Sequence, residues 1–323
     1  MSDTLQTQIL AEFNKGEKRP AILKIKKYLL INPKDIQARL NLAYMYININ
    51  LIDQAVIEYK YILKIDRNLQ AMFSLAICYA NQKRFDDSKR FLQKIINIDK
   101  NYFKAYRALG DIYFSLNDAE KACKYLYLAK QLSPNDPTLL NILGTAEMKR
   151  GNYNYAEKYL LESIKNKANY KNAYNNLAAL YQKMGENKKS IKIFYQLLAD
   201  SPKDQRLLNN MGNVLIDLNR YKDAIYYLKR AINIDSSDAS FYSNLGRALF
   251  FSEKYKDAGV ILKKSLALNS KLYEAQLMFF YLSIVKKDLK KAWIYFDSRL
   301  AVKNYFFPKN LNLFGDIKNK KIL

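Results

Sequence analysis

A repeat of about 34 residues constrains the fold of this 323-residue chain more than any other feature. One position of the repeat is always small, and its occurrences are spaced 33 residues once and 34 residues five times: Ala43, Ala76, Gly110, Gly144, Ala178, Gly212 and Gly246. A second small position follows each by twelve residues and extends further toward both ends: Ala21, Ala55, Ser88, Ala122, Ala156, Ser190, Ala224, Ala258 and Ala292. The chain therefore repeats one structural unit along most of its length.

The apolar residues around both small positions follow a helical period. Leu42, Ala43 and Tyr46 share one face of a helix, and Ala122 and Leu126 begin a second stripe after the next break. Each repeat is therefore predicted to hold two helices, which we call helix A and helix B. A Gly or Ala where two antiparallel helices cross lets their backbones approach to the short end of the ~8–10 Å interaxial range.

Short polar segments separate the helices. Arg150-Gly151-Asn152 is a break within a repeat, and the breaks between repeats hold Pro33, Pro134 and Pro202. Proline suits a first helical turn and disrupts a helix interior, so these positions mark where helices begin.

This pattern resembles the tetratricopeptide repeat. The repeat at 103–136 carries nearly all of the family's motif, at Leu109, Gly110, Tyr113, Ala122, Leu126, Ala129 and Pro134. We divide the chain into nine such repeats: 2–35, 36–68, 69–102, 103–136, 137–170, 171–204, 205–238, 239–272 and 273–306. The resemblance implies an all-α fold, a right-handed superhelical solenoid of antiparallel helix pairs that binds other proteins.

The ends of the array depart from the pattern. Ile9 and Phe280 stand where the middle repeats have Gly or Ala, which is expected of terminal repeats that act as caps. The tail at 307–323 is apolar and then basic, and we expect it to cover the last repeat; the alternative is a short recognition segment that another subunit covers. The repeat at 36–68 is one residue short in the loop Asp66-Arg67-Asn68, which predicts a local change of superhelical twist.

The candidate binding residues lie on helices A, which line the concave groove in the family that this chain resembles. Asn41, Asn176, Asn210 and Asn244 share one slot, two residues before the small residue. Further polar residues fill neighbouring groove slots: Asn172, Asn175, Arg206, Asn209, Asn213, Ser243 and Arg247. An amide offers an acceptor and two donors to a peptide backbone, so such a column suits an extended peptide with little sequence preference. The alternative is that Asn is abundant in this chain and these side chains are merely solvated.

The same family includes groove types that the sequence does not match. The amide column resembles the groove of the tetratricopeptide domain of O-linked N-acetylglucosamine transferase, but the chain is too short to carry that enzyme's catalytic region. The carboxylate clamp for chaperone C-termini needs Lys, Asn and Arg at set positions of three consecutive repeats. Lys104 and Arg107 lack the matching Asn, and Asn209 and Asn213 lack the Lys, so we do not expect a chaperone clamp.

The net charge of +24 allows a second kind of partner. The basic residues that we place on helices B would face the convex side: Lys60, Lys124, Lys158, Lys192, Lys229, Arg230, Lys263 and Lys264. They form either a solvated surface or a track for an acidic protein, a membrane surface or RNA. No aromatic platform interleaves with them on helix B, so nucleic acid is not the expected partner. The chain is also rich in Lys, Asn, Ile and Tyr, whose codons are rich in A and T, and genome bias accounts for part of the charge.

Catalysis is not expected. The chain has no His, no GxxxxGK[ST] or GxGxxG loop, and an open solenoid groove perturbs pKa values poorly, so we predict no enzyme activity, no cofactor and no metal. Cys78 and Cys123 lack CxxC spacing and are predicted to be free, partly buried thiols. No signal peptide or membrane span stands out, which favours a cytoplasmic protein, with peripheral attachment to a membrane complex left open.

Three functions follow. The first is a scaffold whose groove holds an extended peptide or a helix of a partner in a multiprotein assembly. The second is a module that binds a polyanion through the basic convex face. The third, an assembly factor of a cell-envelope machine such as a secretion, pilus or flagellar apparatus, rests only on analogy with other soluble repeat proteins.

Overall fold

The computed structural model describes residues 2–168 and 170–295. Within them the chain is entirely helical, as predicted. The helices are α1 (Ser2–Asn14), α2 (Lys18–Ile31), α3 (Ile36–Asn48), α4 (Ile52–Ile65), α5 (Leu69–Asn81), α6 (Phe85–Ile98), α7 (Phe103–Ser115), α8 (Ala119–Leu132), α9 (Pro137–Arg150), α10 (Tyr153–Asn166), α11 (Lys171–Lys183), α12 (Asn187–Asp200), α13 (Gln205–Asp217), α14 (Tyr221–Ile234), α15 (Ala239–Phe251), α16 (Tyr255–Leu268), α17 (Tyr273–Val285) and α18 (Leu289–Ile294). The predicted tail at 307–323 and the end of the ninth repeat lie outside the described residues.

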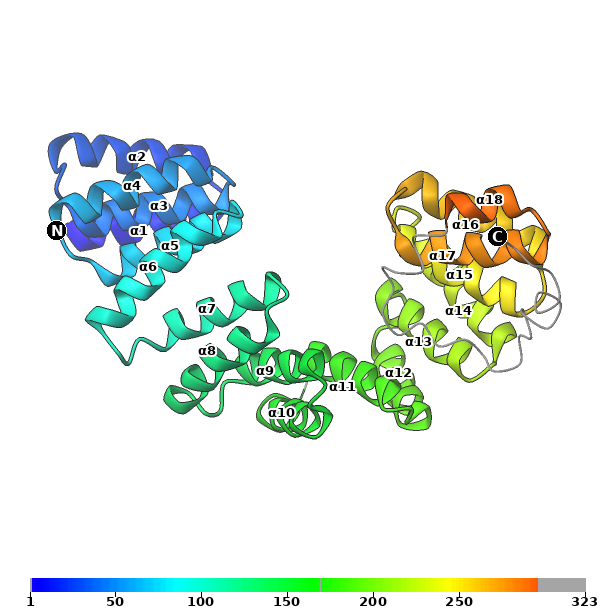
Figure 1. The fold of residues 1–323 in the computed structure, drawn as a ribbon. Helices are drawn as coiled ribbons and strands as arrows, with labels where there is room; N and C mark the ends of the chain where they lie inside the picture. The colour runs from blue at the N-terminus through cyan, green and yellow to red at the C-terminus, as the bar shows by residue number, and fades with distance from the viewer. Residues whose placement is uncertain (1, 169, 296–323) are drawn as a thin grey trace. The chain divides into compact units, whose positions relative to one another are not determined.

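The chain divides into two compact parts. We call residues 1–169, with α1 to α10, the N-terminal body, and residues 170–323, with α11 to α18, the C-terminal body. In both, the odd-numbered helices are helices A and the even-numbered ones are helices B, joined by short loops (Figure 1). Each body is treated separately below.

Helices A form the inner layer of each body. In the C-terminal body α11 packs on α13, α13 on α15 and α15 on α17, and in the N-terminal body α1 packs on α3, α5 on α7 and α7 on α9. Each helix B packs on the helix A of its own repeat and on the helix A that follows within the same body, and no two helices B form a packed pair in the part of the chain described. In the C-terminal body the helix A layer is therefore continuous over its repeats, whereas in the N-terminal body α3 and α5 do not form such a pair.

The small residues allow the close crossing that the sequence predicts. A Cβ atom added to Gly110 would lie 2.5 Å from Leu126 Cγ, and one added to Gly212 would lie 2.6 Å from Leu228 Cγ. Real Cβ atoms do not approach other atoms so closely, so helix B places a leucine where helix A has no side chain.

Helix beginnings follow capping chemistry more than proline. Asp136 Oδ1 accepts hydrogen bonds from the backbone N–H groups of Thr138 and Leu139 at 2.8 and 3.0 Å, and Asp204 caps α13 in the same way. Pro137 occupies the first turn of α9. Pro134 lies in the preceding turn, outside the helix, as do Pro33 and Pro202, so the prediction that prolines mark first helical turns was wrong by a few residues.

Both cysteines are more deeply buried than predicted. Cys78 is 2% exposed and Cys123 is 1% exposed, and both are free thiols. Burial raises the pKa of Cys78 to about 11, and burial together with a hydrogen bond to Glu147 raises that of Cys123 to about 12. The two thiols are therefore core residues that stay protonated at neutral pH. No described helix has the length and apolarity that a bilayer crossing requires.

Candidate functional site

The C-terminal body carries the predicted column of amides on α11, α13 and α15. Asn176, Asn210 and Asn244 are half-buried, one on each of these helices, and 34 residues separate each from the next. Because α11, α13 and α15 pack side by side, equal spacing in the sequence gives an equal position in each repeat.

Hydrogen bonds join these side chains across the repeats. Asn210 Nδ2 donates to Asn175 Oδ1 at 2.8 Å, which links α13 to α11. Asn244 Nδ2 donates to Asn209 Oδ1 at 2.9 Å, which links α15 to α13 in the same way. The amides are thus fixed in orientation by the packing of the solenoid itself, and simple solvation does not account for them.

The lateral bonds leave part of each amide for a partner. Asn210 and Asn244 each use one of their two N–H donors in these bonds, so the second N–H and the Oδ1 acceptor remain. One donor and one acceptor on the same planar group match the C=O and N–H of a peptide backbone. A preformed orientation also lowers the entropy cost of binding.

The other predicted groove residues divide by exposure. Asn172 and Arg206 are exposed, and Asn175, Asn213 and Arg247 are half-buried. Arg247 Nη2 donates to Asn213 Oδ1 at 3.2 Å and lies 3.9 Å from Asp217 Oδ1, so this end of the face combines an amide, a cation and a carboxylate.

Two predicted groove residues do not reach the surface. Asn209 is 8% exposed and Ser243 is 3% exposed. Both stand one residue before a column Asn, and a step of one residue on a helix turns the side chain by about 100°, here toward the interior. Their assignment to the binding face was wrong, and Asn209 acts indirectly because its Oδ1 holds the amide of Asn244.

Asn41 belongs to the N-terminal body and has no continuation there. Its Nδ2 donates to Gln6 Oε1 at 3.3 Å, and its Oδ1 accepts from Gln37 at 3.1 Å. The following repeats of this body hold Ser74, Ala108 and Ile142 in the same slot. The predicted series is therefore a column only in the C-terminal body.

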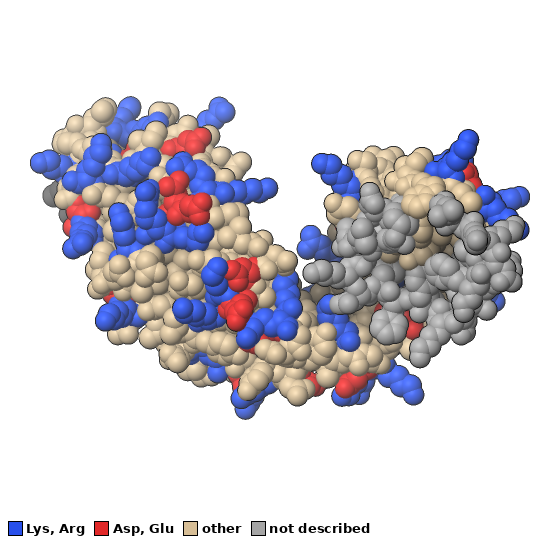
Figure 2. Space-filling model, viewed as in Figure 1, with Lys and Arg blue, Asp and Glu red and all other residues tan. Residues whose placement is uncertain are grey.

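The basic residues predicted on helices B are exposed, except Arg230, which is half-buried. Lys and Arg side chains are scattered over the face in view, most densely on the N-terminal body, with Asp and Glu side chains set among them (Figure 2). Sequence reasoning missed that several of the cations in the N-terminal body cover tyrosine rings of helix A. Lys60 Nζ lies 6.0 Å from the ring centroid of Tyr79, and Lys89 and Lys121 each lie 5.6 Å from that of Tyr113. Tyr79 is buried, so this ring packs beneath its cation and offers no platform for a base.

A buried carboxylate was also missed. Glu147, on α9, accepts hydrogen bonds from Tyr127 Oη at 2.7 Å, Asn152 Nδ2 at 2.7 Å and Arg150 Nη1 at 3.0 Å. Burial alone would raise the pKa of Glu147, but the hydrogen bonds outweigh it and the net shift is downward. The sequence could have revealed this residue. Four residues after Leu42, Leu75 and Leu109 the chain has Tyr, whereas four residues after Leu143 it has Glu147.

Two family models match the chain. The model of the coatomer epsilon subunit matches residues 7–205, which is more than half of the chain, and a TPR repeat model matches residues 187–250. No curated protein matches the sequence significantly.

Solved structures resemble the chain in fold. A tetratricopeptide repeat protein from Parabacteroides merdae ATCC 43184 has a TM-score of 0.65 at 15% identity, and the match covers 80% of this chain and 98% of that one. The structure of the APC/C hetero-tetramer Cut9-Hcn1 has a TM-score of 0.64 at 16% identity, and the match covers 82% of this chain but only 52% of that one. PilW, a type IV pilus biogenesis factor, has a TM-score of 0.59 at 16% identity, with 66% of this chain and 98% of that one covered. At this identity the likeness shows the fold alone, and it is that of a tetratricopeptide array.

Proposed function

The chain belongs to the tetratricopeptide-repeat family and, through residues 7–205, to the family that the coatomer epsilon subunit model describes. On this premise we propose that it is a non-catalytic scaffold. The scaffold holds an extended segment of a partner protein on the amide column of Asn176, Asn210 and Asn244. The observation that carries the proposal is the pair of lateral hydrogen bonds that fix Asn210 and Asn244 while leaving a donor and an acceptor on each.

The spacing of the column supports an extended ligand. Packed helices lie ~8–10 Å apart, and an extended peptide advances ~3.3 Å per residue. One amide therefore meets about every third residue of the peptide. Contacts of this kind read the backbone, so the proposed groove accepts varied sequences and takes its selectivity from flanking groups such as Arg206 and Arg247.

A place in a multiprotein assembly is part of the proposal. The matched proteins are named as a coatomer subunit, a member of the APC/C hetero-tetramer and a pilus biogenesis factor. A more specific form of this proposal is that the chain is an assembly factor of a cell-envelope machine. The cytoplasmic location expected from the sequence remains a prediction.

A displayed library of random peptides tests the groove. We expect the wild-type chain to enrich peptides that the Asn176→Ala, Asn210→Ala, Asn244→Ala triple variant binds about tenfold more weakly, since a few central contacts carry most of the binding energy. The matched control is Lys192→Ala, Lys229→Ala, Lys263→Ala, which changes helix B of the same three repeats. Circular dichroism confirms that both triple variants remain helical. Equal binding by the wild type and the Asn variant contradicts the proposal.

A further inference from the structure

The loop between α4 and α5 is one residue shorter than the other loops that join repeats within the two bodies. It holds residues 66–68, whereas the loop between α6 and α7, for example, holds residues 99–102. Asn68 is the N-cap of α5, because its Oδ1 accepts a hydrogen bond from the Ala71 N–H at 2.8 Å. Asp66 and Arg67 alone bridge the remaining gap. At this junction α3 and α5 are not among the closely packed pairs of the described helices, although α5 packs on α7.

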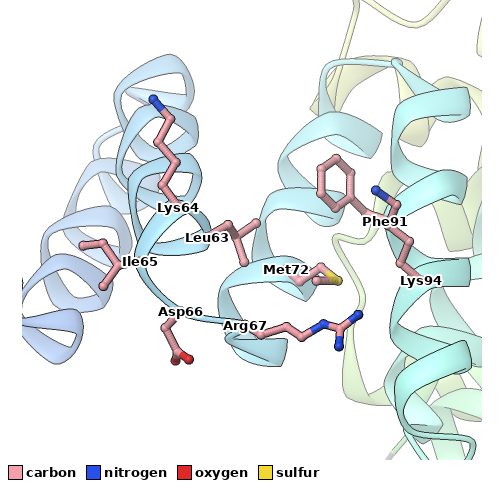
Figure 3. Close-up of a pocket in the computed structure, with 8 residues that line it drawn as sticks. All are labelled: Leu63, Lys64, Ile65, Asp66, Arg67, Met72, Phe91 and Lys94. Carbon is pink, nitrogen blue, oxygen red and sulfur yellow. The ribbon is translucent and has the colours of Figure 1, made fainter.

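A cavity of about 380 Å³ lies at this junction, between the end of α4, the start of α5 and the middle of α6 (Figure 3). Its apolar lining comes from Leu63, Met72 and Phe91, one residue from each helix. Met72 is 8% exposed, so the lining is continuous with the core between the repeats. The volume is at the lower end of the ~300–1,000 Å³ range of ligand pockets, and it has room for one large side chain.

Two cations stand at the rim of this cavity. Arg67 and Lys94 extend on either side of Met72, and Lys64, Ile65 and Asp66 at the end of α4 complete the lining (Figure 3). Lys94 Nζ lies 5.6 Å from the Phe91 ring centroid. Neither Arg67 nor Lys94 forms an ion pair within the described residues. Five other arginines of the N-terminal body are paired, as Arg84 is with Asp87 at 2.6 Å, whereas the exposed Arg19 forms no ion pair within the described residues.

We infer that this cavity is a second binding site, which takes one large apolar side chain from an acidic segment of a partner protein while Arg67 and Lys94 hold a neighbouring carboxylate. The planar guanidinium of Arg67 matches a carboxylate bidentately, and Lys94 adds a second positive charge on the other side of Met72. An apolar anchor in a pocket with a charged rim is the usual form of an interaction hot spot. The net charge of +24 attracts acidic segments over a longer range.

The site differs from the amide column in what it recognises. The column reads a peptide backbone, whereas this cavity reads one side chain and one negative charge. A nucleic acid fits poorly, because Phe91 is the only aromatic residue that lines the cavity and it is half-buried. The other loops that join repeats within the two bodies have four residues. We attribute the opening between these two repeats to the residue that the loop at 66–68 lacks.

Fluorescein-labelled peptides of Asp and Glu with one central Phe, Leu, Trp or Ala test the inference by fluorescence anisotropy with the whole chain. We expect at least one of the Phe, Leu and Trp peptides to bind about tenfold more tightly than the Ala peptide, because only they fill the cavity. Arg67→Glu should weaken that peptide by about tenfold, and Arg19→Glu, an equal change of charge at an exposed site on α2, by no more than about twofold. A glycine inserted after Asp66, which restores a regular loop, should abolish the preference for Phe over Ala.

Three results overturn the inference. Equal affinity for all four peptides would show attraction by net charge alone. Equal loss in Arg67→Glu and Arg19→Glu would show that the rim has no special role. Saturable binding of phenylacetate at the cavity with no peptide preference would identify a site for small anions instead. Circular dichroism of each variant establishes that the chain remains folded, and the preference for the apolar peptides over the Ala peptide should persist in the Asn176→Ala, Asn210→Ala, Asn244→Ala variant.

Discussion

The two bodies share one backbone repeat but join their helices A by different chemistry. In the C-terminal body amide side chains bond across neighbouring repeats, at Asn175 with Asn210 and at Asn209 with Asn244. In the N-terminal body one amide pair, Asn41 with Gln6 at 3.3 Å, links α3 to α1, and α9 meets α7 through Lys149 Nζ, which lies 4.0 Å from the ring centroid of Phe114.

The difference shows which part of the repeat is constrained. Each repeat must bury the same apolar stripes, so the core residues hardly vary along the chain. The side chains that meet at the helix A surface are under no such demand and are free to differ between bodies. We therefore expect the two bodies to recognise different things, the C-terminal body a peptide backbone and the N-terminal body a specific side chain.

The largest expected effect comes from removing the buried carboxylate of the N-terminal body. Glu147→Ala leaves Tyr127, Asn152 and Arg150 without their acceptor, and we expect the free energy of unfolding to fall by about 2–3 kcal/mol. Urea denaturation measures the loss, and faster labelling of the Cys123 thiol localises it to this body.

The pKa of Glu147 is lowered in the folded state. Its contribution is therefore present above the unfolded pKa of about 4.3 and is lost as pH falls further.

Glu147→Gln is the matched control for this prediction. It keeps the shape and can still accept two of the hydrogen bonds, so it should cost less than the Ala variant. If Glu147→Ala leaves both stability and thiol labelling unchanged, the network does not hold the N-terminal body together.

A smaller effect is expected at the small position of the repeat, where each body holds Gly in some repeats and Ala in others. The Cβ of Gly212→Ala would lie 2.6 Å from Leu228 Cγ, whereas Ala76 carries a Cβ in the same slot beside Leu92. We expect Gly212→Ala to cost about 1 kcal/mol, because overpacking of ~1–3 kcal/mol outweighs a gain in helix propensity of up to ~1 kcal/mol. Thermal unfolding measures it. An equal cost in a Leu228→Ala background would contradict the steric explanation.

The fold was largely predictable from the sequence for the same physical reason. Every repeat must solve one packing problem, so Gly110, Gly144, Gly212 and Gly246 repeat the same contact, and their spacing reveals the helices and their crossings. The positions of the helices needed no knowledge of what the chain binds.

The candidate sites were less predictable because they depend on small rotations and on missing atoms. Asn209 and Ser243 were placed on the surface, although one residue along a helix separates a groove position from a buried one. Glu147 went unnoticed because it replaces a Tyr rather than a small residue. The cavity beside Met72 lies next to the loop that is one residue short, and an absent residue has no type from which to predict a cavity.

The next effect concerns the amide column itself. Asn210→Ala and Asn244→Ala each remove one hydrogen bond between repeats, and we expect each to lower the free energy of unfolding by about 1 kcal/mol. Asn233→Ala, on exposed α14 surface of the same body, should cost nothing. Urea denaturation of the three variants separates the cases. If all three behave alike, the lateral bonds do not stabilise the C-terminal body, and the contrast between the two bodies loses its energetic basis.

The smallest effect is expected on the basic helices B, where the two bodies are alike. Charge reversal to Glu at Lys60, Lys124 and Lys158, or at Lys192, Lys229 and Lys263, changes exposed residues and should alter stability by no more than ~0.5 kcal/mol per site. Both triple variants should lose affinity for heparin equally, to within about twofold, and the loss should shrink as salt rises, because unspecific attraction depends on net charge and counterion release. Titration at several salt concentrations measures this. A loss about tenfold greater for one body would reveal a defined polyanion track there, and the surface that distinguishes the two bodies would then be helix B rather than helix A.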